Sequence, residues 1–228
     1  PTPVRFLTEG NDDDGGTTAT TASITPTSGK TVVVSLYLAS DMADWVTGQT
    51  YPIYMKENFF DPLQMNNTFV VSFADSLPRN QSYNASGGIW QMDYTDGPYG
   101  DKNIYSTPRD LLKWDQSFYK NTILKQSILD SAYVAYSNER PSMHNYGLGW
   151  RLLHLKNGKK IIYHNGHWHG FNSAFARLTD ENATIIILSN KYNTNVYTTA
   201  KKLYNLFGNY DGKQDDAQRE HQRGALRL

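Results

Sequence analysis

The 228-residue chain contains no cysteine, which excludes disulfides, thiolate metal ligands and a cysteine nucleophile. Neither sign of charge is in excess, because 22 Lys and Arg balance 22 Asp and Glu. A chain with this balance has no strong overall field that would attract nucleic acid or an anionic membrane surface. No apolar run approaches the roughly 20 residues of a membrane-spanning helix, and residues 1–16 lack the basic and then apolar order of a secretion signal. We therefore predict neither a nucleic-acid partner nor a membrane span.

Aromatic residues, in contrast, are abundant, with 16 Tyr, 9 Phe and 5 Trp, and most of them follow residue 31. Residues 9–30 are rich in Gly, Thr, Ser and Asp and have no apolar periodicity, and the last residues are polar and charged. Such segments do not bury enough apolar surface to order themselves. We predict an atypical or flexible segment over 1–30, a folded domain over 31–211 and a disordered tail over 212–228.

Helical signals alternate with turn signals along this folded part. Thr107 is a good N-cap, and it is followed by Pro108 at the first helical position and by Asp110 in the first turn. Gly48 and Gly208 stand where helices end. The pattern predicts helices over residues 39–46, 52–60, from 107 onward, 125–135 and 196–207.

Strand signals gather in the second half of the chain. Apolar runs of strand length occupy residues 31–38, 146–155, 160–166, 171–178 and 184–190. Asn157-Gly158 separates two of these runs, and Asn-Gly between apolar runs is the strongest short-range signal for a hairpin. The last four runs therefore predict an antiparallel meander, and the fold class is α+β with an antiparallel sheet packed against helices.

Three short motifs follow one another in a fixed order: Pro62-Leu63-x-Met65, Tyr146-Gly147-x-Gly149-Trp150 and His164-Asn165-Gly166. With the segments around them, from about Ala39 to Asp211, they resemble the second half of the serine β-lactamase-like family. That family includes class C β-lactamases, penicillin-binding DD-peptidases and related esterases. The resemblance implies a β-lactamase/transpeptidase-like fold that is truncated in this chain, with an active site between a sheet and a helical lobe.

The family's chemistry uses a Ser-x-x-Lys nucleophile, a Tyr-x-Asn loop and a strand of the Lys/His-Thr/Ser/Asn-Gly type. A serine needs a neighbouring base to become nucleophilic, and the oxyanion that develops needs fixed donors. The resemblance assigns the third element to His164, Asn165 and Gly166. It implies that His164 faces the substrate carboxylate or the proton relay, that Gly166 lets the backbone approach the ligand, and that the His167 amide donates to the oxyanion. No cofactor is implied.

The first two elements are not at their expected places. Residues 1–38 contain no Ser-x-x-Lys, and Thr27-Ser28-Gly29-Lys30 offers only a threonine version. A literal Ser-x-x-Lys begins at Ser117, and literal Tyr-x-Asn matches begin at Tyr119 and Tyr136. Ser117 falls at the end of a predicted helix, where the negative partial charge disfavours a serine alkoxide. We interpret these matches as structural.

Three histidines, His164, His167 and His169, stand within six residues and raise the alternative of a metal site. On a strand His167 and His169 share one face and His164 lies on the other, unless a bulge forms at Gly166. Three imidazoles on one zinc ion need that bulge. A strand-end histidine with an ordinary hydrogen bond is the bland alternative for His164.

Aromatic residues of the long loop and of the histidine segment are candidates for lining a substrate groove. They are Trp90, Tyr94, Tyr99 and Trp168, with core or lid packing as the alternative. Glycoside hydrolysis would need two facing carboxylates. Asp93, Asp96 and Asp101 in the long loop are the candidates for these, but we favour their interpretation as solvated turn residues.

The leading functional hypothesis is a hydrolase that transfers the acyl group of a small ester or amide, such as a β-lactam or a peptide. The alternatives are a catalytically inactive remnant that binds ligands or itself, and a glycoside hydrolase on the same scaffold. A shortened domain exposes apolar sheet surface, so we expect "TVVVSLYL" or "PVRFL" to supply an edge strand, with exchange between subunits of a homo-oligomer. The resemblance further implies a bacterial protein with a periplasmic or secreted location.

Overall fold

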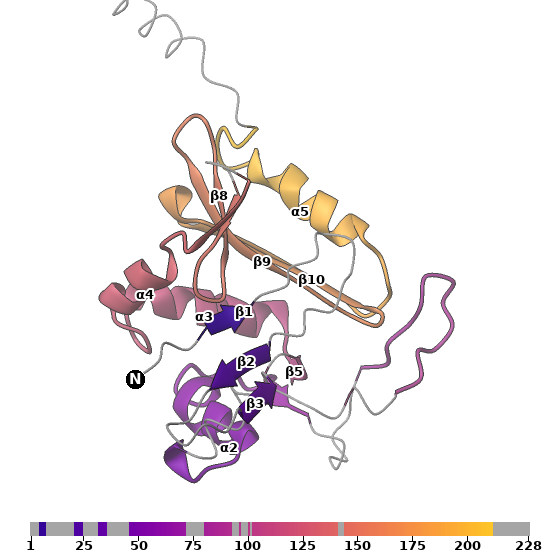
Figure 1. Ribbon diagram of the computed structural model, residues 1–228. Helices are drawn as coiled ribbons and strands as arrows, with labels where there is room; N and C mark the ends of the chain where they lie inside the picture. Colours follow the sequence, from indigo (N-terminus) through magenta and orange to yellow (C-terminus); the bar gives the residue numbers. More distant parts are fainter. Residues whose placement is uncertain are drawn as a thin grey trace, which may run out of the picture. The chain divides into compact units, whose positions relative to one another are not determined.

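The computed structural model describes residues 5–7, 21–24, 32–35, 46–71, 80–92, 96, 100, 102–140 and 144–211 (Figure 1). The predicted tail, most of residues 1–30 and most of the predicted helix over 39–46 lie outside these ranges. The chain forms two compact units. The first contains residues 1–79 and 91–106, and the second contains residues 80–90 and 107–228.

The first unit contains a three-stranded antiparallel sheet of β1 (Arg5–Leu7), β2 (Thr21–Ile24) and β3 (Val32–Ser35). β3 confirms a strand within residues 31–38, although it is shorter than predicted. Among the described strands, β1 and β3 pair with β2 alone. The expectation that one of these segments extends the large sheet is therefore wrong for a single chain.

A second part of the first unit is helical. α2 (Tyr51–Met55) continues into the π-helix η1 (Lys56–Phe60), which confirms the helix predicted over 52–60. β4 (Phe69–Val70) and β5 (Ile104–Tyr105) form a small antiparallel pair, which no sequence pattern predicted because two residues carry no period. Met65 is 3% exposed, so this member of the first motif is a core residue.

The second unit is built on a six-stranded antiparallel sheet in the order β11-β10-β9-β8-β7-β6. The strands are β6 (Ser137–Arg140), β7 (His144–Tyr146), β8 (Arg151–His154), β9 (Lys160–Trp168), β10 (Phe171–Leu178) and β11 (Ala183–Ser189). The predicted meander is confirmed, as is the hairpin at Asn157-Gly158, where Gly158 has a φ of +88°. Each strand is hydrogen-bonded to its neighbour in the sequence, so the sheet grows by successive hairpins.

The single strand predicted over 146–155 is wrong, because a turn divides it into β7 and β8. The Gly147 N–H donates to the Trp150 carbonyl at 2.7 Å, and Gly149 has a φ of +74°, which favours glycine. A Cβ on Gly147 would lie 2.1 Å from the Ala132 carbonyl oxygen. The glycines of this motif are thus needed for a tight turn that packs against the end of α4 (Gln126–Ala132).

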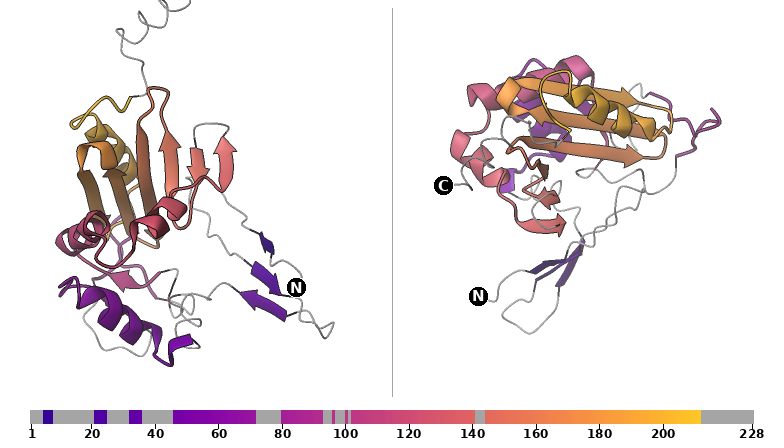
Figure 2. Two further views of the ribbon diagram at one scale, coloured as in Figure 1. Left: turned by 90° about the vertical axis from the view of Figure 1, so that its left-hand side faces the viewer. Right: turned by 90° about the horizontal axis from the view of Figure 1, so that it is seen from above.

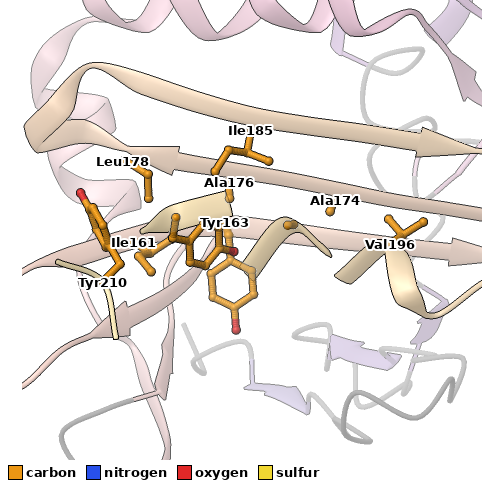
Figure 3. Packing of buried hydrophobic residues seen from close by; sticks show 10 residues of the cluster. Ile161, Tyr163, Ala174, Ala176, Leu178, Ile185, Val196 and Tyr210 are labelled. Carbon is orange, nitrogen blue, oxygen red and sulfur yellow. The ribbon is translucent and has the colours of Figure 1, made fainter. Parts of the chain in front are cut away.

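One face of the sheet is apolar and is covered by α5 (Asn195–Tyr204), which lies along β10 and β11 (Figure 2). The alternate residues of the central strands point to this face. The cluster consists of Ile161, Tyr163, Ala174, Ala176, Leu178 and Ile185, packed against Val196, Ala200, Tyr204 and Tyr210 (Figure 3). Burying one such aliphatic side chain contributes about 1.5–3 kcal/mol, so this cluster is the main core of the unit.

The opposite face of the sheet meets α3 (Pro108–Lys120), which contacts β11. The predicted cap is confirmed, since the Asp110 N–H donates to the Thr107 hydroxyl at 3.2 Å.

None of the helices within the described ranges is long and apolar enough to cross a membrane.

Candidate functional site

The segment His164–His167 lies in the part of β9 that extends beyond β8. In the β8–β9 hairpin the Leu155 N–H donates to the Lys159 carbonyl at 2.9 Å, so Lys159 directs its backbone groups toward β8. In antiparallel strands this direction repeats at every second residue, which gives Asn165 and His167 the same direction. β8 begins at Arg151, which pairs with Tyr163, so no described β8 residue stands opposite Asn165 or His167. We call this stretch of β9, residues 164–167, the open edge.

His164 is exposed and its imidazole Nε2 lies 2.8 Å from the hydroxyl of Tyr146. The pKa of His164 is lowered from 6.5, first because the surrounding protein removes hydration from the imidazolium and second because the Arg151 guanidinium repels it. A backbone hydrogen bond with Asn165 acts in the opposite direction and is outweighed. The neutral ring is therefore favoured near neutral pH, as a proton acceptor or a hydrogen-bond partner requires.

Gly166 is held from both sides of the sheet. A Cβ there would lie 2.4 Å from the Ser173 hydroxyl oxygen on β10, so a larger residue would have to displace that hydroxyl. The Tyr197 hydroxyl donates to the Gly166 carbonyl at 3.0 Å and accepts from the side-chain amide of Asn172 at 2.8 Å. Asn172 is 1% exposed. This chain of hydrogen bonds fixes the open edge against α5.

The far end of β9 is aromatic. The His169 ring lies 4.9 Å from the Trp90 ring and 4.8 Å from the Trp168 ring, measured between centroids. Two of the four groove candidates thus contact one histidine, whereas Tyr94 and Tyr99 lie outside the described residues. The loop that carries Trp90 is fixed here by a close backbone contact, since a Cβ on Gly170 would lie 2.0 Å from the Tyr83 carbonyl oxygen.

The three histidines do not converge. The pairing of β9 with β10 runs from Ile162 to Trp168 without a register shift, so the bulge required at Gly166 is not formed. His164 stands opposite Phe175, whereas His167 stands opposite Asn172, which places the two rings on opposite faces. Among the described residues no group of three His, Asp or Glu side chains is arranged to hold a metal ion.

The literal matches to the missing motifs have structural contacts. Ser117 is 2% exposed and its hydroxyl donates to the Trp114 carbonyl at 2.7 Å. The Tyr119 ring lies 4.8 Å from the Arg177 guanidinium, and the exposed Tyr136 donates to the Ser131 carbonyl. None of these residues belongs to the open edge.

The carboxylates considered for glycoside hydrolysis do not form a described pair. Asp96 is buried, and Asp93 and Asp101 lie outside the described residues.

A shallow pocket of 310 Å³ lies between α3 and β11, lined by Leu112, Asp115, Gln116, Tyr119, Lys120, Asn182 and Thr184. It contains none of the predicted site residues, and the Asp115 carboxylate there already accepts from Arg177 and Thr184.

Sequence reasoning missed the residues that support the open edge, namely Arg151, Asn172 and Tyr197, and treated Tyr146 only as part of a motif. Asn172 gave a usable signal, because it is a polar residue at an inward position of a strand whose other inward residues are Ala174, Ala176 and Leu178. A buried amide in such a row requires hydrogen-bond partners. Arg151 and Tyr197 gave no comparable signal.

Comparisons with known proteins agree with this fold. The β-lactamase family model matches residues 34–209. Penicillin-binding protein 4* of Bacillus subtilis (strain 168) is 28% identical over 171 residues, covering 68% of this chain and 38% of that protein. The chain thus spans well under half the length of this curated relative.

Solved structures show the same fold. The octameric penicillin-binding protein homologue from Pyrococcus abyssi has a TM-score of 0.62 at 18% identity, over 73% of this chain and 40% of that one. A D-stereospecific amidohydrolase from Streptomyces sp. has a TM-score of 0.57 at 21% identity, over 72% of this chain and 51% of that one. Both structures share a β-lactamase/transpeptidase-like α+β fold with this chain, which spans about half of each or less.

Proposed function

Because this chain belongs to the β-lactamase family, we propose that it forms part of a hydrolase that acts by acyl transfer on a small ester or amide. β-Lactams and peptides are the amide candidates, and carboxylic esters are the ester candidates. The observation that carries the proposal is the open edge of β9, where His164 stands beside backbone groups that β8 does not pair.

The open edge supplies the donors that acyl transfer needs. A carbonyl that is attacked becomes an oxyanion, and fixed N–H groups stabilise it more in the transition state than in the ground state. The His167 N–H has the direction of the unpaired side of β9, and the hydrogen bond from Tyr197 to Gly166 holds the neighbouring backbone in place. We assign the oxyanion contact to the His167 amide and the proton or substrate contact to the neutral His164 ring. Asn165 and Gly166 complete this wall of the site.

The nucleophile is the part that this wall does not provide. The one literal Ser-x-x-Lys begins at Ser117, whose hydroxyl is buried and bonded within α3. The proposed reaction therefore takes its nucleophile from another part of the polypeptide or from a partner chain. The same observation favours a second candidate, in which the chain is a binding or self-associating domain without turnover.

An activity panel separates these candidates. Nitrocefin, p-nitrophenyl esters and p-nitrophenyl glycosides would be offered to the wild-type protein, to His164→Ala and to the control His154→Ala on β8. We expect ester or amide turnover that His164→Ala lowers by about 100-fold, the scale of a lost acid–base group, and that the control leaves unchanged. Turnover that is equal in wild type and His164→Ala would remove His164 from the mechanism.

Intact-mass measurement with a fluorophosphonate and with a β-lactam complements the panel. An adduct, mapped to its residue by peptide analysis, identifies the nucleophile and supports acyl transfer. Neither adduct nor turnover on any substrate would favour the binding domain. Turnover of the glycosides alone would favour glycoside hydrolysis instead.

Self-association is the second part of the proposal. β11 carries no charged residue, pairs with β10 alone among the described strands and presents a seven-residue outer edge. Such an apolar edge is a template for another strand, and the similar Pyrococcus abyssi protein is octameric. We expect light scattering to show an oligomer that Leu188→Lys, a charge placed on β11, dissociates. A monomer at all concentrations would reject this part.

The location is proposed on the family resemblance. Penicillin-binding proteins and their relatives suggest a bacterial protein in the periplasm or outside the cell. Fractionation of the source cells, with detection of the chain in the cytoplasmic fraction alone, would reject this assignment.

A further inference from the structure

The Tyr146 side chain contacts the His164 ring across one intervening strand. Tyr146 ends β7 and His164 lies on β9, with β8 between them, and the hydroxyl oxygen is 2.8 Å from Nε2. The two rings meet edge to face, with centroids 6.0 Å apart and planes at 87°. The Arg151 guanidinium of β8 lies 5.5 Å from the centre of the Tyr146 ring. Tyr146 is therefore placed between a cation and the imidazole at the start of the open edge.

The direction of the hydrogen bond follows from the charge of His164. The loss of hydration beside the surrounding protein and the Arg151 cation lower the pKa of His164, so the ring is neutral near pH 7 and has one N–H and one lone pair. A phenol O–H is a stronger donor than the N–H of a neutral imidazole, and the imidazole lone pair is a stronger acceptor than the phenol oxygen. The 2.8 Å contact is therefore best made with the lone pair on Nε2 and the Tyr146 hydroxyl as the donor.

We propose that Tyr146 is a positioning residue: its hydroxyl donates to Nε2 of His164 and fixes the neutral imidazole as the tautomer with the proton on Nδ1. Arg151 on β8 is the charged group that acts on the ring, and Phe175, opposite on β10, is apolar. The ring is thus held at the open edge by the Tyr146 hydroxyl at Nε2. The value of this arrangement for turnover rests on the proposed function, but the hydrogen bond and the tautomer do not.

Nuclear magnetic resonance of the ¹⁵N-labelled full chain tests the proposal directly. Long-range ¹H–¹⁵N correlation distinguishes a protonated ring nitrogen from one with a lone pair. We expect the lone-pair signature at Nε2 and the N–H signature at Nδ1 of His164. In Tyr146→Phe we expect a mixture of tautomers and a higher pKa of His164, because the donor that favoured the neutral ring is gone.

Two controls separate the hydrogen bond from other effects. Arg151→Gln removes the cation, so it raises the pKa of His164 and leaves the tautomer unchanged. Tyr192→Phe alters a tyrosine whose ring lies 5.3 Å from that of His167, and it leaves both properties of His164 unchanged. A change of tautomer in Tyr146→Phe alone supports the assignment.

Two results would overturn the proposal. One is an N–H signature at Nε2 in the wild-type protein, which makes the hydroxyl the acceptor. The other is a pKa of His164 that falls in Tyr146→Phe. The wild-type tautomer answers the question even when the variant does not fold. Since no substrate is needed, the hydrogen bond can fail while acyl transfer is retained, or hold in a protein without turnover.

Discussion

The two faces of the large sheet, the α5 face covered by α5 and the α3 face that meets α3, are stabilised in different ways. The α5 face buries aliphatic and aromatic side chains, with Leu178 and Ile161 fully buried. The α3 face buries an ion pair, in which Arg177 Nε donates to Asp115 at 2.5 Å and both side chains are at most 3% exposed. The Phe118 and Tyr119 rings each lie 4.8 Å from the guanidinium. The α5 face is thus stabilised mainly by apolar burial, whereas the α3 face adds to its own buried apolar side chains, such as Leu152 and Ile162, a buried charge that must be completely paired.

Asp115→Ala on the α3 face gives the largest expected effect. It leaves Arg177 buried without its carboxylate and also removes the acceptor of the Thr184 hydroxyl. Breaking one partner of a buried pair costs about 3–5 kcal/mol of the free energy of unfolding. Denaturant unfolding followed by far-UV circular dichroism measures the loss.

The matched control for this prediction removes both charges. Asp115→Leu combined with Arg177→Met leaves no unpaired ion, so the double variant should recover most of the stability lost in Asp115→Leu alone. A double variant less stable than either single variant would show that Arg177 is needed for its aromatic contacts rather than for its ion pair.

Leu178→Ala on the α5 face gives the next largest effect. Removing a fully buried leucine side chain from a packed core costs about 2–5 kcal/mol of the free energy of unfolding. Leu188→Ala on β11 is the control, because Leu188 is 37% exposed. Equal losses for the two variants would contradict the view that this face is stabilised by buried apolar area. The measurement is again the midpoint of urea unfolding.

The sequence predicted the α5 face far better than the α3 face. Alternating apolar residues from Ala174 to Leu178 indicate one buried face, and the structure confirms the strand from Phe171 to Leu178. Arg177 lies in the same run at a position that alternation assigns to the other face. A cation at such a position is typically exposed to solvent. Only the tertiary packing of α3 against the sheet brings Asp115 beside it.

The open edge was predictable in position but not in detail. The motif His164-Asn165-Gly166 marked the segment, and the strand around it is confirmed as β9. The contacts to Tyr146 and Tyr197 depend on where β7 and α5 pack, which local pattern does not encode. The turn at Gly147–Trp150 was missed because its flanking apolar residues resemble a continuous strand.

Tyr197→Phe tests the hydrogen bond that connects α5 to the open edge. The variant keeps the ring and removes the hydroxyl that links Gly166 to Asn172, whose buried amide then loses one partner. We expect a loss of about 1 kcal/mol in the free energy of unfolding and faster amide hydrogen exchange at Gly166 and His167. Unchanged exchange there would show that β10 alone holds the open edge. Tyr192→Phe is the control.

The smallest expected effect is a dependence of the free energy of unfolding on pH, caused by two histidines on the α3 face. His154 and His164 lie on that side of the sheet, by alternation from Leu152 and Ile162. The pKa values of both are lowered from 6.5, in each case first because the surrounding protein removes hydration from the imidazolium and then by a neighbouring cation, Lys160 for His154 and Arg151 for His164.

Well above pH 6.5 both rings are neutral in the folded and unfolded chains, and their contribution to stability is fully present. As the pH falls below 6.5 the unfolded chain takes up protons first, so the free energy of unfolding decreases until the lower folded pKa values are passed. Urea unfolding between pH 7.5 and pH 5 measures this slope. His164→Gln should reduce the slope, and adding His154→Gln in the same chain should reduce it further. The reason is that lost hydration and a nearby cation act on each ring separately. A slope that both substitutions leave intact would place the titrating groups elsewhere and remove the pH dependence from the contrast between the two faces.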